Sequence, residues 1–328
     1  MKILMFDVSD LENERIRKFA DENKELDIKV YRTDVTAVKD EDCDADVISI
    51  FINSAIKREN LERFTRLKFI LTRSTGFDHI DINECKNRGI KVCNVPDYGD
   101  ATVAEFVFFL ALCLMRGTRL DRTGEIKTTP GRELNGKTIG IIGAGRIGTR
   151  VAEIAKAFRM RILYDSHRNN QIIDGMGGLK VGLDELLSSS DIVSLHVPLT
   201  DETYHLINKD NIKRFKPGSF IINTSRGATI DTEALIEGLD SGTIAGAALD
   251  VIEGEEFSGR EMEIIRKKEN YDMLRIALEG NILRRYENVI LTPHIAYNTH
   301  EALGRIIDET LENLSSIASG KEPRNQLD

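Results

Sequence analysis

Short apolar segments alternate with amphipathic segments along the first part of the chain. Because strands that alternate with helices form parallel sheets, this part is expected to be an α/β domain. The spacing of apolar residues predicts strands over 2–8, 27–32, 46–52, 67–73 and 90–95, and helices over 10–22, 58–66 and 81–88.

The same alternation begins again after an apolar helix. That helix is predicted over 103–116, where Thr102 and Glu105 have the spacing of a capping box, and a polar stretch, 117–136, follows it. The fold class expected is therefore α/β, with two doubly wound parallel-sheet domains of Rossmann or flavodoxin-like type separated by a cleft. Later strands are predicted near 161–164, 191–197, 219–223, 244–250 and 288–292, and helices near 183–190, 231–240 and 299–318.

A glycine-rich turn opens the second half. A short apolar strand over 138–142 runs into Gly143, Gly145 and Gly148, which have the spacing G-x-G-x-x-G. The first glycine of this motif makes a tight turn, the second lets the backbone approach a pyrophosphate, and the third lets the helix pack on the strand. The pyrophosphate is then held at a helix N-terminus, where unpaired N–H groups favour an anion. The motif predicts a dinucleotide site.

An acidic residue, Asp165, ends the next predicted strand. A carboxylate at this position accepts hydrogen bonds from the ribose hydroxyls and repels a 2′-phosphate, which favours NAD over NADP. His167 and Arg168 lie close by and moderate that preference, because each can carry positive charge.

Composition and charge exclude several kinds of partner. The chain is 41% hydrophobic and 30% charged, the balance of a globular protein with a sizeable core. Its net charge of −9 argues against nucleic acid or an anionic membrane. The longest apolar run, 106–115, is too short for a membrane span, and the chain opens on a strand rather than a signal peptide. Four cysteines without zinc-ligand spacing predict no metal site and a reducing, cytoplasmic location.

Two chain crossings are expected to divide the domains, one near 96–100 and one near Pro293, and to form a hinge. The predicted domains are 1–99 plus 295–328, which would bind substrate, and 100–294, which would bind NAD. The charged segment 253–286 has no strand pattern and is expected to be a surface insertion.

Three polar side chains follow predicted strands of the second half: Arg226, Glu255 and His294. Ligands of open parallel sheets bind beyond the carboxyl ends of strands. An arginine can pair with a carboxylate while it polarises the neighbouring carbonyl, and a histidine can give and take a proton near neutral pH. A glutamate beside an imidazole favours its charged form. The three suit a nicotinamide enzyme acting on a keto or hydroxy acid; a surface ion pair and a structural Pro-His turn are the alternatives.

Six ordered motifs resemble those of the D-2-hydroxyacid dehydrogenases, and the similarity covers nearly the whole chain. The segment around Thr75 and Gly76, together with Tyr98 and Tyr297, looks most like the NAD-dependent D-lactate dehydrogenases. The motifs are Asn-Val-Pro-Asp-Tyr98, the glycine turn, Leu-His196-Val-Pro-Leu-Thr, Ile-Asn-Thr-Ser-Arg226-Gly, Ala-Leu-Asp250-Val-Ile-Glu-Gly-Glu255 and Thr-Pro-His294-Ile-Ala-Tyr297.

The resemblance implies a role for each matching residue. Arg226 would bind the substrate carboxylate and polarise the keto oxygen, His294 would be the acid/base, and Glu255 would pair with it. Thr75 and Gly76 would offer backbone N–H groups to the carboxylate, Tyr98 would close the pocket, and Tyr297 is a further expected substrate contact. The implied cofactor contacts are Gly143, Gly145, Arg146, Ile147 and Gly148 around the pyrophosphate, Asp165 at the ribose, His196, Val197, Pro198 and Thr203 along the cofactor's wall, and Thr224, Ser225, Arg226 and Asp250 at the nicotinamide end.

The activity that the resemblance implies is NADH-dependent reduction of pyruvate, or a close 2-keto acid, to the D-2-hydroxy acid. Hydroxypyruvate, glyoxylate and aromatic or branched 2-keto acids are alternative substrates, since Asn53 stands where lactate enzymes are expected to carry a tyrosine. An NAD-sensing binding protein or corepressor is the alternative of a different class, and the intact Arg226, Glu255 and His294 argue against it. A homodimer is expected, with no nucleic-acid or membrane partner.

Overall fold

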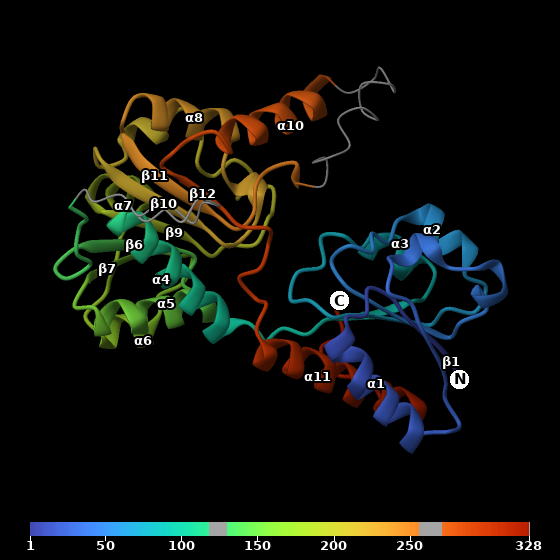
Figure 1. Ribbon diagram of the computed structural model, residues 1–328. Coiled ribbons are helices and arrows are strands. Elements are labelled where there is room, and N and C mark those ends of the chain that lie inside the picture. The colour runs from blue at the N-terminus through green and yellow to red at the C-terminus, as the bar shows by residue number, and fades with distance from the viewer. Residues whose placement is uncertain (118–129, 256–270, 328) are drawn as a thin grey trace. The chain divides into compact units, whose positions relative to one another are not determined.

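The chain folds as two compact units, Met1–Gly99 with Asn298–Asp328, and Asp100–Tyr297. This is seen in a computed structural model that describes residues 1–117, 130–255 and 271–327 (Figure 1). Each unit contains one parallel sheet, so the predicted fold class is confirmed. The second unit extends to Tyr297, and His294 and Tyr297 therefore belong to the same unit as the glycine turn.

The sheet of the first unit has the strand order β2-β1-β3-β4-β5, which is the flavodoxin-like order. Its strands are β1 (Lys2–Met5), β2 (Asp27–Val30), β3 (Val47–Ile50), β4 (Phe69–Thr72) and β5 (Lys91–Cys93). Its helices are α1 (Asp10–Glu22), α2 (Arg58–Arg63), α3 (Ile82–Asn87) and α11 (His300–Ala318), with 3-10 turns η1 (Val35–Ala37) and η2 (Asp40–Asp42).

Two helices from opposite ends of the chain cover one face of this sheet. In Figure 1, α1 and α11 lie side by side, and Arg15 of α1 forms an ion pair with Asp308 of α11. Ile16 and Ile307 are buried together against Ile3 and other strand residues. The opposite face packs against α2, α3 and the 3-10 turns in a second apolar cluster. Both faces are buried, which explains the continuous apolar runs of the strands.

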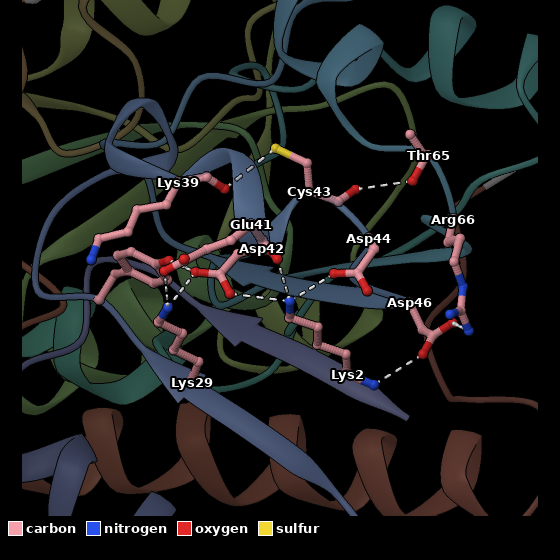
Figure 2. A network of polar contacts seen from close by, with 11 residues as sticks. Lys2, Lys29, Lys39, Glu41, Asp42, Cys43, Asp44, Asp46, Thr65 and Arg66 are labelled. Carbon is pink, nitrogen blue, oxygen red and sulfur yellow. Dashed lines mark hydrogen bonds and ion pairs between the residues drawn. The ribbon is translucent and has the colours of Figure 1, made fainter.

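Charged side chains gather at the amino ends of these strands (Figure 2). Lys2, which begins β1, lies 2.6 Å from Asp44 and 3.1 Å from the carboxylate of Asp42. Asp42 is almost fully buried and also accepts hydrogen bonds from Lys29 and Tyr31. Burial acts to raise the pKa of Asp42, but the hydrogen bonds from Lys29, Tyr31 and Lys2 outweigh it and lower that pKa to about 2. These ion pairs tie β1 and β2 to the segment around Asp42.

The sheet of the second unit has the order β12-β11-β10-β9-β6-β7-β8, the Rossmann order with one further strand at the β12 edge. Its strands are β6 (Thr138–Ile142), β7 (Arg161–Asp165), β8 (Leu179–Lys180), β9 (Ile192–Leu195), β10 (Ser219–Asn223), β11 (Ile244–Leu249) and β12 (Val289–Leu291). Its helices are α4 (Asp100–Arg116), α5 (Arg146–Ala157), α6 (Gln171–Gly175), α7 (Leu183–Ser189), α8 (Thr232–Asp240) and α10 (Tyr271–Leu283), with 3-10 turns η3 (Ile212–Arg214) and η4 (Gly227–Thr229).

Helices cover both faces of this sheet as well. One apolar cluster joins α4, α5 and α6 to the strands, and another joins α7, α8 and the end of α10 to the opposite face (Figure 1). Among the described residues, none of the helices combines the length and apolar content that a membrane span requires.

The expected capping box at Thr102 is wrong. The helix α4 begins at Asp100, so Thr102 lies inside its first turn and is buried there. An acidic residue is favourable in a first helical turn, and Asp100 also forms an ion pair with Arg146, 3.2 Å away. Part of the polar stretch 117–136 and residues 256–270 of the expected insertion lie outside the described residues, and the insertion ends in helix α10.

Candidate active site

Six strands of the second sheet end level with one another. In register across the sheet, Ile142 pairs with Asp165 and Leu195, Asn223 with Leu195 and Leu249, and Leu249 with Leu291. These strands are parallel, so the segments that follow these residues leave from the same carboxyl edge. The predicted site residues Gly143, His196, Arg226, Asp250 and His294 therefore lie along one edge of the sheet.

The glycine turn follows β6 at the point where the strand order reverses. Gly143 has a φ of +96°, and a Cβ there would come within 2.5 Å of the carbonyl oxygen of His196. A Cβ at Gly148 would lie 2.1 Å from the carbonyl oxygen of Gly143, so α5 packs too closely on the turn for any side chain. A Cβ at Gly145 would meet nothing within 4 Å. The open side of the turn is thus at Gly145, where α5 begins and its first N–H groups are exposed to an anion.

Asn170 supports the turn through its side chain, a role that no sequence pattern indicated. Its side-chain amide donates to the carbonyl oxygen of Ala144 at 2.9 Å and to the hydroxyl of Thr149 at 2.8 Å. Its Oδ1 caps α6 by accepting from Ile172 and Ile173. The Ala144 carbonyl oxygen is thereby paired within the protein, which suits a site for a negatively charged pyrophosphate.

Asp165 lies beside the glycine turn, and its carbonyl oxygen accepts the N–H of Gly143 at 2.9 Å. Burial raises the pKa of the Asp165 carboxyl, while the nearby charges of Lys180 and His167 act to lower it. Lys180 could not be recognised from the sequence because it belongs to β8, a strand of two residues without an apolar pattern. It pairs in register with Tyr164, so a cation stands close to the expected ribose position.

The residues expected around the pyrophosphate and along the cofactor's wall differ in what they contact. Arg146 forms an ion pair with Asp100, and the side chain of Ile147 packs on the apolar core. Val197 follows His196 and is partly buried, Pro198 is exposed, and the hydroxyl of Thr203 donates to the carbonyl oxygen of Pro198 at 2.6 Å. The segment after His196 is therefore held by a hydrogen bond within the chain.

His196 cannot supply a proton at neutral pH. Burial lowers the pKa of its imidazole to about 3, so the ring is neutral at pH 7. Its Nε2 lies 2.8 Å from the hydroxyl of Ser194, and its backbone N–H donates to the carbonyl oxygen of Ile142. A neutral, partly buried ring fits a wall of the dinucleotide site and not an acid/base.

The loop after β10 carries Arg226. Asn223 Nδ2 and the hydroxyl of Thr229 donate to the carbonyl oxygen of Arg226 at 2.9 and 2.6 Å. The Nη1 of Arg226 donates to the carbonyl oxygen of Ser225, and Ser225 in turn donates twice to Asn223 Oδ1. The loop is therefore held by a set of internal hydrogen bonds, one of which is donated by the guanidinium itself. A Cβ at Gly227 would lie 2.1 Å from the backbone of Ile252, so this loop packs directly on the segment that leads to Glu255.

Thr224 carries an unusual hydroxyl. Its Oγ1 is buried and has no hydrogen-bond partner in the described part of the chain. A buried polar atom without a partner costs stability, so such atoms are rare, and the hydroxyl of Ser219 is the other one in the described part of the chain. Thr224 stands at the expected nicotinamide end, and its hydroxyl would be satisfied by a polar group of a bound cofactor.

His294 and Glu255 form the pair that the sequence predicted. The His294 Nδ1 lies 3.2 Å from Glu255 Oε1, and both side chains are partly exposed. With Nδ1 engaged, the Nε2 of the imidazole is the nitrogen left for a substrate. The ring of Tyr297 stands edge-on to that of His294, with 6.2 Å between ring centroids.

Asp250 holds the backbone that carries His294. The Asp250 Oδ1 accepts from the Thr292 hydroxyl and the Ile295 N–H, and its Oδ2 accepts from the Ala296 N–H. Its carbonyl oxygen accepts the N–H of His294 at 3.0 Å. His294 has a φ of +51°, a left-handed conformation that is costly for a residue with a Cβ. Asp250 is 1% exposed, so its carboxylate serves the 292–296 loop rather than solvent.

The loop Ser74–Gly76 of the first unit presents backbone N–H groups. Its carbonyls at Ser74, Thr75 and Gly76 accept from Val95 N–H, Asn94 Nδ2 and Ser74 Oγ, respectively. Among the described residues, the N–H groups of Thr75 and Gly76 have no acceptor. This is the arrangement expected of a carboxylate site.

Tyr98 is buried, and its carbonyl oxygen accepts two hydrogen bonds from Arg305 of α11. The described residues contain no group of His, Cys, Asp and Glu side chains arranged to hold a metal ion.

Comparison with known proteins identifies the family. Residues 107–296 match the model of the D-isomer specific 2-hydroxyacid dehydrogenase, NAD binding domain. The chain belongs to the D-isomer-specific 2-hydroxyacid dehydrogenases. A glyoxylate reductase of Thermococcus litoralis is 38% identical over 296 residues, with 86% of this chain and 83% of that protein covered. An aromatic 2-oxoacid reductase of Clostridium sporogenes is 39% identical, with 86% and 85% covered.

Solved structures agree with this family. A D-lactate dehydrogenase of Aquifex aeolicus, complexed with NAD and lactic acid, superimposes with a TM-score of 0.83 at 37% identity, covering 97% of this chain and 96% of that one. The predicted family and the NAD cofactor are thus confirmed, and the dehydrogenase is an NAD-dependent oxidoreductase. The glycine turn, the open side at Gly145 and the unpaired Thr224 hydroxyl fit that cofactor.

Proposed function

We propose that this dehydrogenase reduces pyruvate, or a close 2-keto acid, to the D-2-hydroxy acid with NADH. The observation that carries the proposal is the His294–Glu255 pair, on the same sheet edge as Arg226 and the glycine turn. In this proposal, His294 exchanges a proton while Arg226 supplies a cation, at the sheet edge that carries the dinucleotide site. When bound, NADH supplies a hydride from C4 of its nicotinamide ring.

Protonated His294 donates its Nε2 proton to the keto oxygen, while Glu255 holds the ring through Nδ1. Arg226 pairs with the carboxylate and stabilises the negative charge that develops on the keto oxygen. Thr75 and Gly76 supply N–H groups for the carboxylate, and Tyr98 and Tyr297 are substrate contacts. Asp250 keeps the His294 loop in its left-handed conformation and so acts through the backbone.

Pyruvate is favoured among the 2-keto acids because a structural neighbour at 37% identity is a D-lactate dehydrogenase with bound lactic acid. Glyoxylate and aromatic 2-keto acids are the second candidates, since relatives at 38–39% identity are named for them. Asn53 is exposed shortly after β3 and leaves the side-chain preference open to a larger group.

Steady-state assay of purified protein with NADH and a panel of pyruvate, hydroxypyruvate, glyoxylate, 2-ketoisocaproate and phenylpyruvate tests the proposal. Pyruvate is expected to give the highest kcat/KM, and chiral analysis is expected to find D-lactate. A higher kcat/KM for another keto acid would replace pyruvate as the substrate. Absence of NADH oxidation with every keto acid, in a protein that binds NADH, would instead favour the NAD-sensing binding protein.

Substitution Asp165→Ala is expected to relax the preference for NADH over NADPH. The change removes the carboxylate that would repel a 2′-phosphate, and it leaves Lys180 and His167 close to that position. The ratio of kcat/KM for the two cofactors, measured at one pyruvate concentration, reports the effect. An unchanged ratio would assign the preference to His167 or Arg168.

We also propose a homodimer formed through α4 and a cytoplasmic location. Phe109 and Leu112 of α4 are 43% and 38% exposed, although most other apolar residues of this helix are buried. All four cysteines are free and buried, which suits a reducing compartment. Light scattering is expected to give twice the chain mass of 36.9 kDa, and Phe109→Glu is expected to give the monomer mass. Monomeric wild-type protein at micromolar concentration would contradict the dimer.

A further inference from the structure

The first unit contains a fully buried ion pair that the reaction described above does not use. Arg73 directly follows β4, and its side chain has no exposed surface. Its Nε lies 2.9 Å from Glu12 Oε1, and the Glu12 side chain is 6% exposed. Removing a guanidinium and a carboxylate from water is unfavourable, and a pair of well-packed apolar residues is often as stable. Stability alone therefore does not explain this ion pair.

The contacts of Arg73 join three elements at the carboxyl edge of the sheet. Its Nη1 donates to the Ser49 hydroxyl of β3 at 3.0 Å. Its Nη2 donates to the carbonyl oxygens of Phe6 and Asp7, just beyond β1, at 2.6 and 3.1 Å. A planar guanidinium can make these bonds together with the one to Glu12, whereas a lysine ammonium cannot.

Glu12 anchors the other end of the pair. Its Oε2 accepts from the backbone N–H and the hydroxyl of Ser9, and these bonds form the capping box that begins α1. The carboxylate is therefore held by the helix start on one side and by Arg73 on the other. Through Glu12, α1 fixes the position of the residue that follows β4.

The Ser74–Gly76 loop continues directly from Arg73. The carbonyls of this loop are bound by Val95, Asn94 and Ser74, and its N–H groups at Thr75 and Gly76 have no acceptor among the described residues. The backbone of Arg73 is itself bound through its N–H to the carbonyl oxygen of Ile50 at 2.8 Å. The direction of the loop thus depends on where Arg73 is held.

We propose that Arg73, supported by Glu12, is a positioning residue that holds the Ser74–Gly76 loop for the substrate carboxylate. This inference rests on the proposed function, because it requires Thr75 and Gly76 to bind a 2-keto acid. Arg73 does not touch substrate; it fixes the N–H groups that do. Every 2-keto acid has the same carboxylate, so the effect belongs to the whole substrate class and not to one side chain.

Two variants test the proposal. Arg73→Lys keeps the charge beside Glu12 but loses the planar set of donors. The double variant Arg73→Met with Glu12→Gln removes both charges and leaves no unpaired ion in the interior. The KM for each keto acid of the panel, kcat, the Kd of NADH from fluorescence quenching and the Tm are measured for both.

Asp42→Asn is the matched control. Asp42 is a buried carboxylate of the same unit, paired with Lys2 and Lys29, but it lies toward the amino ends of the strands (Figure 2). This variant is expected to lower the Tm and to leave KM unchanged. It separates general loss of stability in this unit from an effect on the Ser74–Gly76 loop.

The KM is expected to rise by about tenfold or more in both Arg73 variants, because misplaced N–H donors lose charge-assisted hydrogen bonds to the carboxylate. The factor is expected to be similar for every keto acid that the wild type uses. The Kd of NADH is expected to stay unchanged. A lowered Tm with unchanged KM would reduce the pair to a structural role and overturn the proposal, as would an equal rise of KM in Asp42→Asn.

If the double variant does not fold, the KM of Arg73→Lys compared with that of Asp42→Asn is sufficient to test the proposal. Failure of the proposed function is seen separately, in the wild type. A different preferred keto acid leaves this inference intact, because the shared carboxylate is what the loop would bind. A wild type that turns over no keto acid overturns both, whatever the Arg73 variants do.

Discussion

Replacement of His294 by glutamine is expected to lower kcat for keto-acid reduction by about 10²–10⁴-fold, the usual contribution of a positioned acid/base group. Glutamine has similar length and polarity but cannot donate a proton as a charged imidazole does. The Kd of NADH is expected to stay within a factor of about two, because His294 is proposed to act on the keto acid and not to bind the dinucleotide. Stopped-flow measurement of a single turnover reports the chemical step directly.

The control for this variant is His300→Gln. His300 is exposed at the first position of α11, and full activity is expected. Glu255→Gln is expected to give an intermediate loss, because an acceptor for Nδ1 remains at this position while the negative charge is removed. Retention of more than about a tenth of the turnover in His294→Gln would rule out His294 as the acid/base.

Replacement of Arg226 by lysine is expected to raise the KM for keto acids by about 10- to 100-fold, the loss that follows when about 1.5–3 kcal/mol of charge-assisted hydrogen bonding is removed. Lysine keeps the charge but loses the planar pair of donors that fits a carboxylate and its neighbouring carbonyl. A fall in kcat is expected as well, since the same group stabilises the charge that develops on the keto oxygen.

The binding of NADH is expected to survive in Arg226→Lys because the loop around it is held by Asn223 and Thr229 through backbone contacts. The matched control is Arg214→Lys in the same unit, where an exposed guanidinium pairs with Asp184 on the surface. No change in kinetics is expected there. An unchanged KM in Arg226→Lys would remove this residue from carboxylate binding.

Most of the architecture could be predicted from the sequence because its strands are buried on both faces. A strand such as β10 has only buried positions, and an apolar run between amphipathic helices therefore marks it reliably. The strand β8 and the helix α6 escaped prediction for the opposite reason. Both residues of β8 are exposed, and α6 is too short for an apolar periodicity to be recognised.

The site could be predicted only as far as residues stand directly after strands. Arg226 and His294 are predicted in this way, because parallel strands deliver their carboxyl ends to one edge. The contacts that support the His294 loop and the Ser74–Gly76 loop could not be predicted. Asp250 reaches the 292–296 loop across some 45 positions of sequence, and Arg73 reaches Glu12 across 61. No local pattern records a contact of this kind, which depends on how distant strands are ordered in the sheet.

The left-handed backbone of His294 has a consequence for protein engineering. A library that varies the residues around His294 in search of new substrates has to keep Asp250 as well as His294, since the Asp250 carboxylate compensates the conformational cost at His294. Arg73 and Glu12 belong to the other compact unit of the chain. Directed evolution can therefore vary the Ser74–Gly76 loop of the first unit and the 292–296 loop of the second in separate rounds, provided that Glu12 is kept in one round and Asp250 in the other.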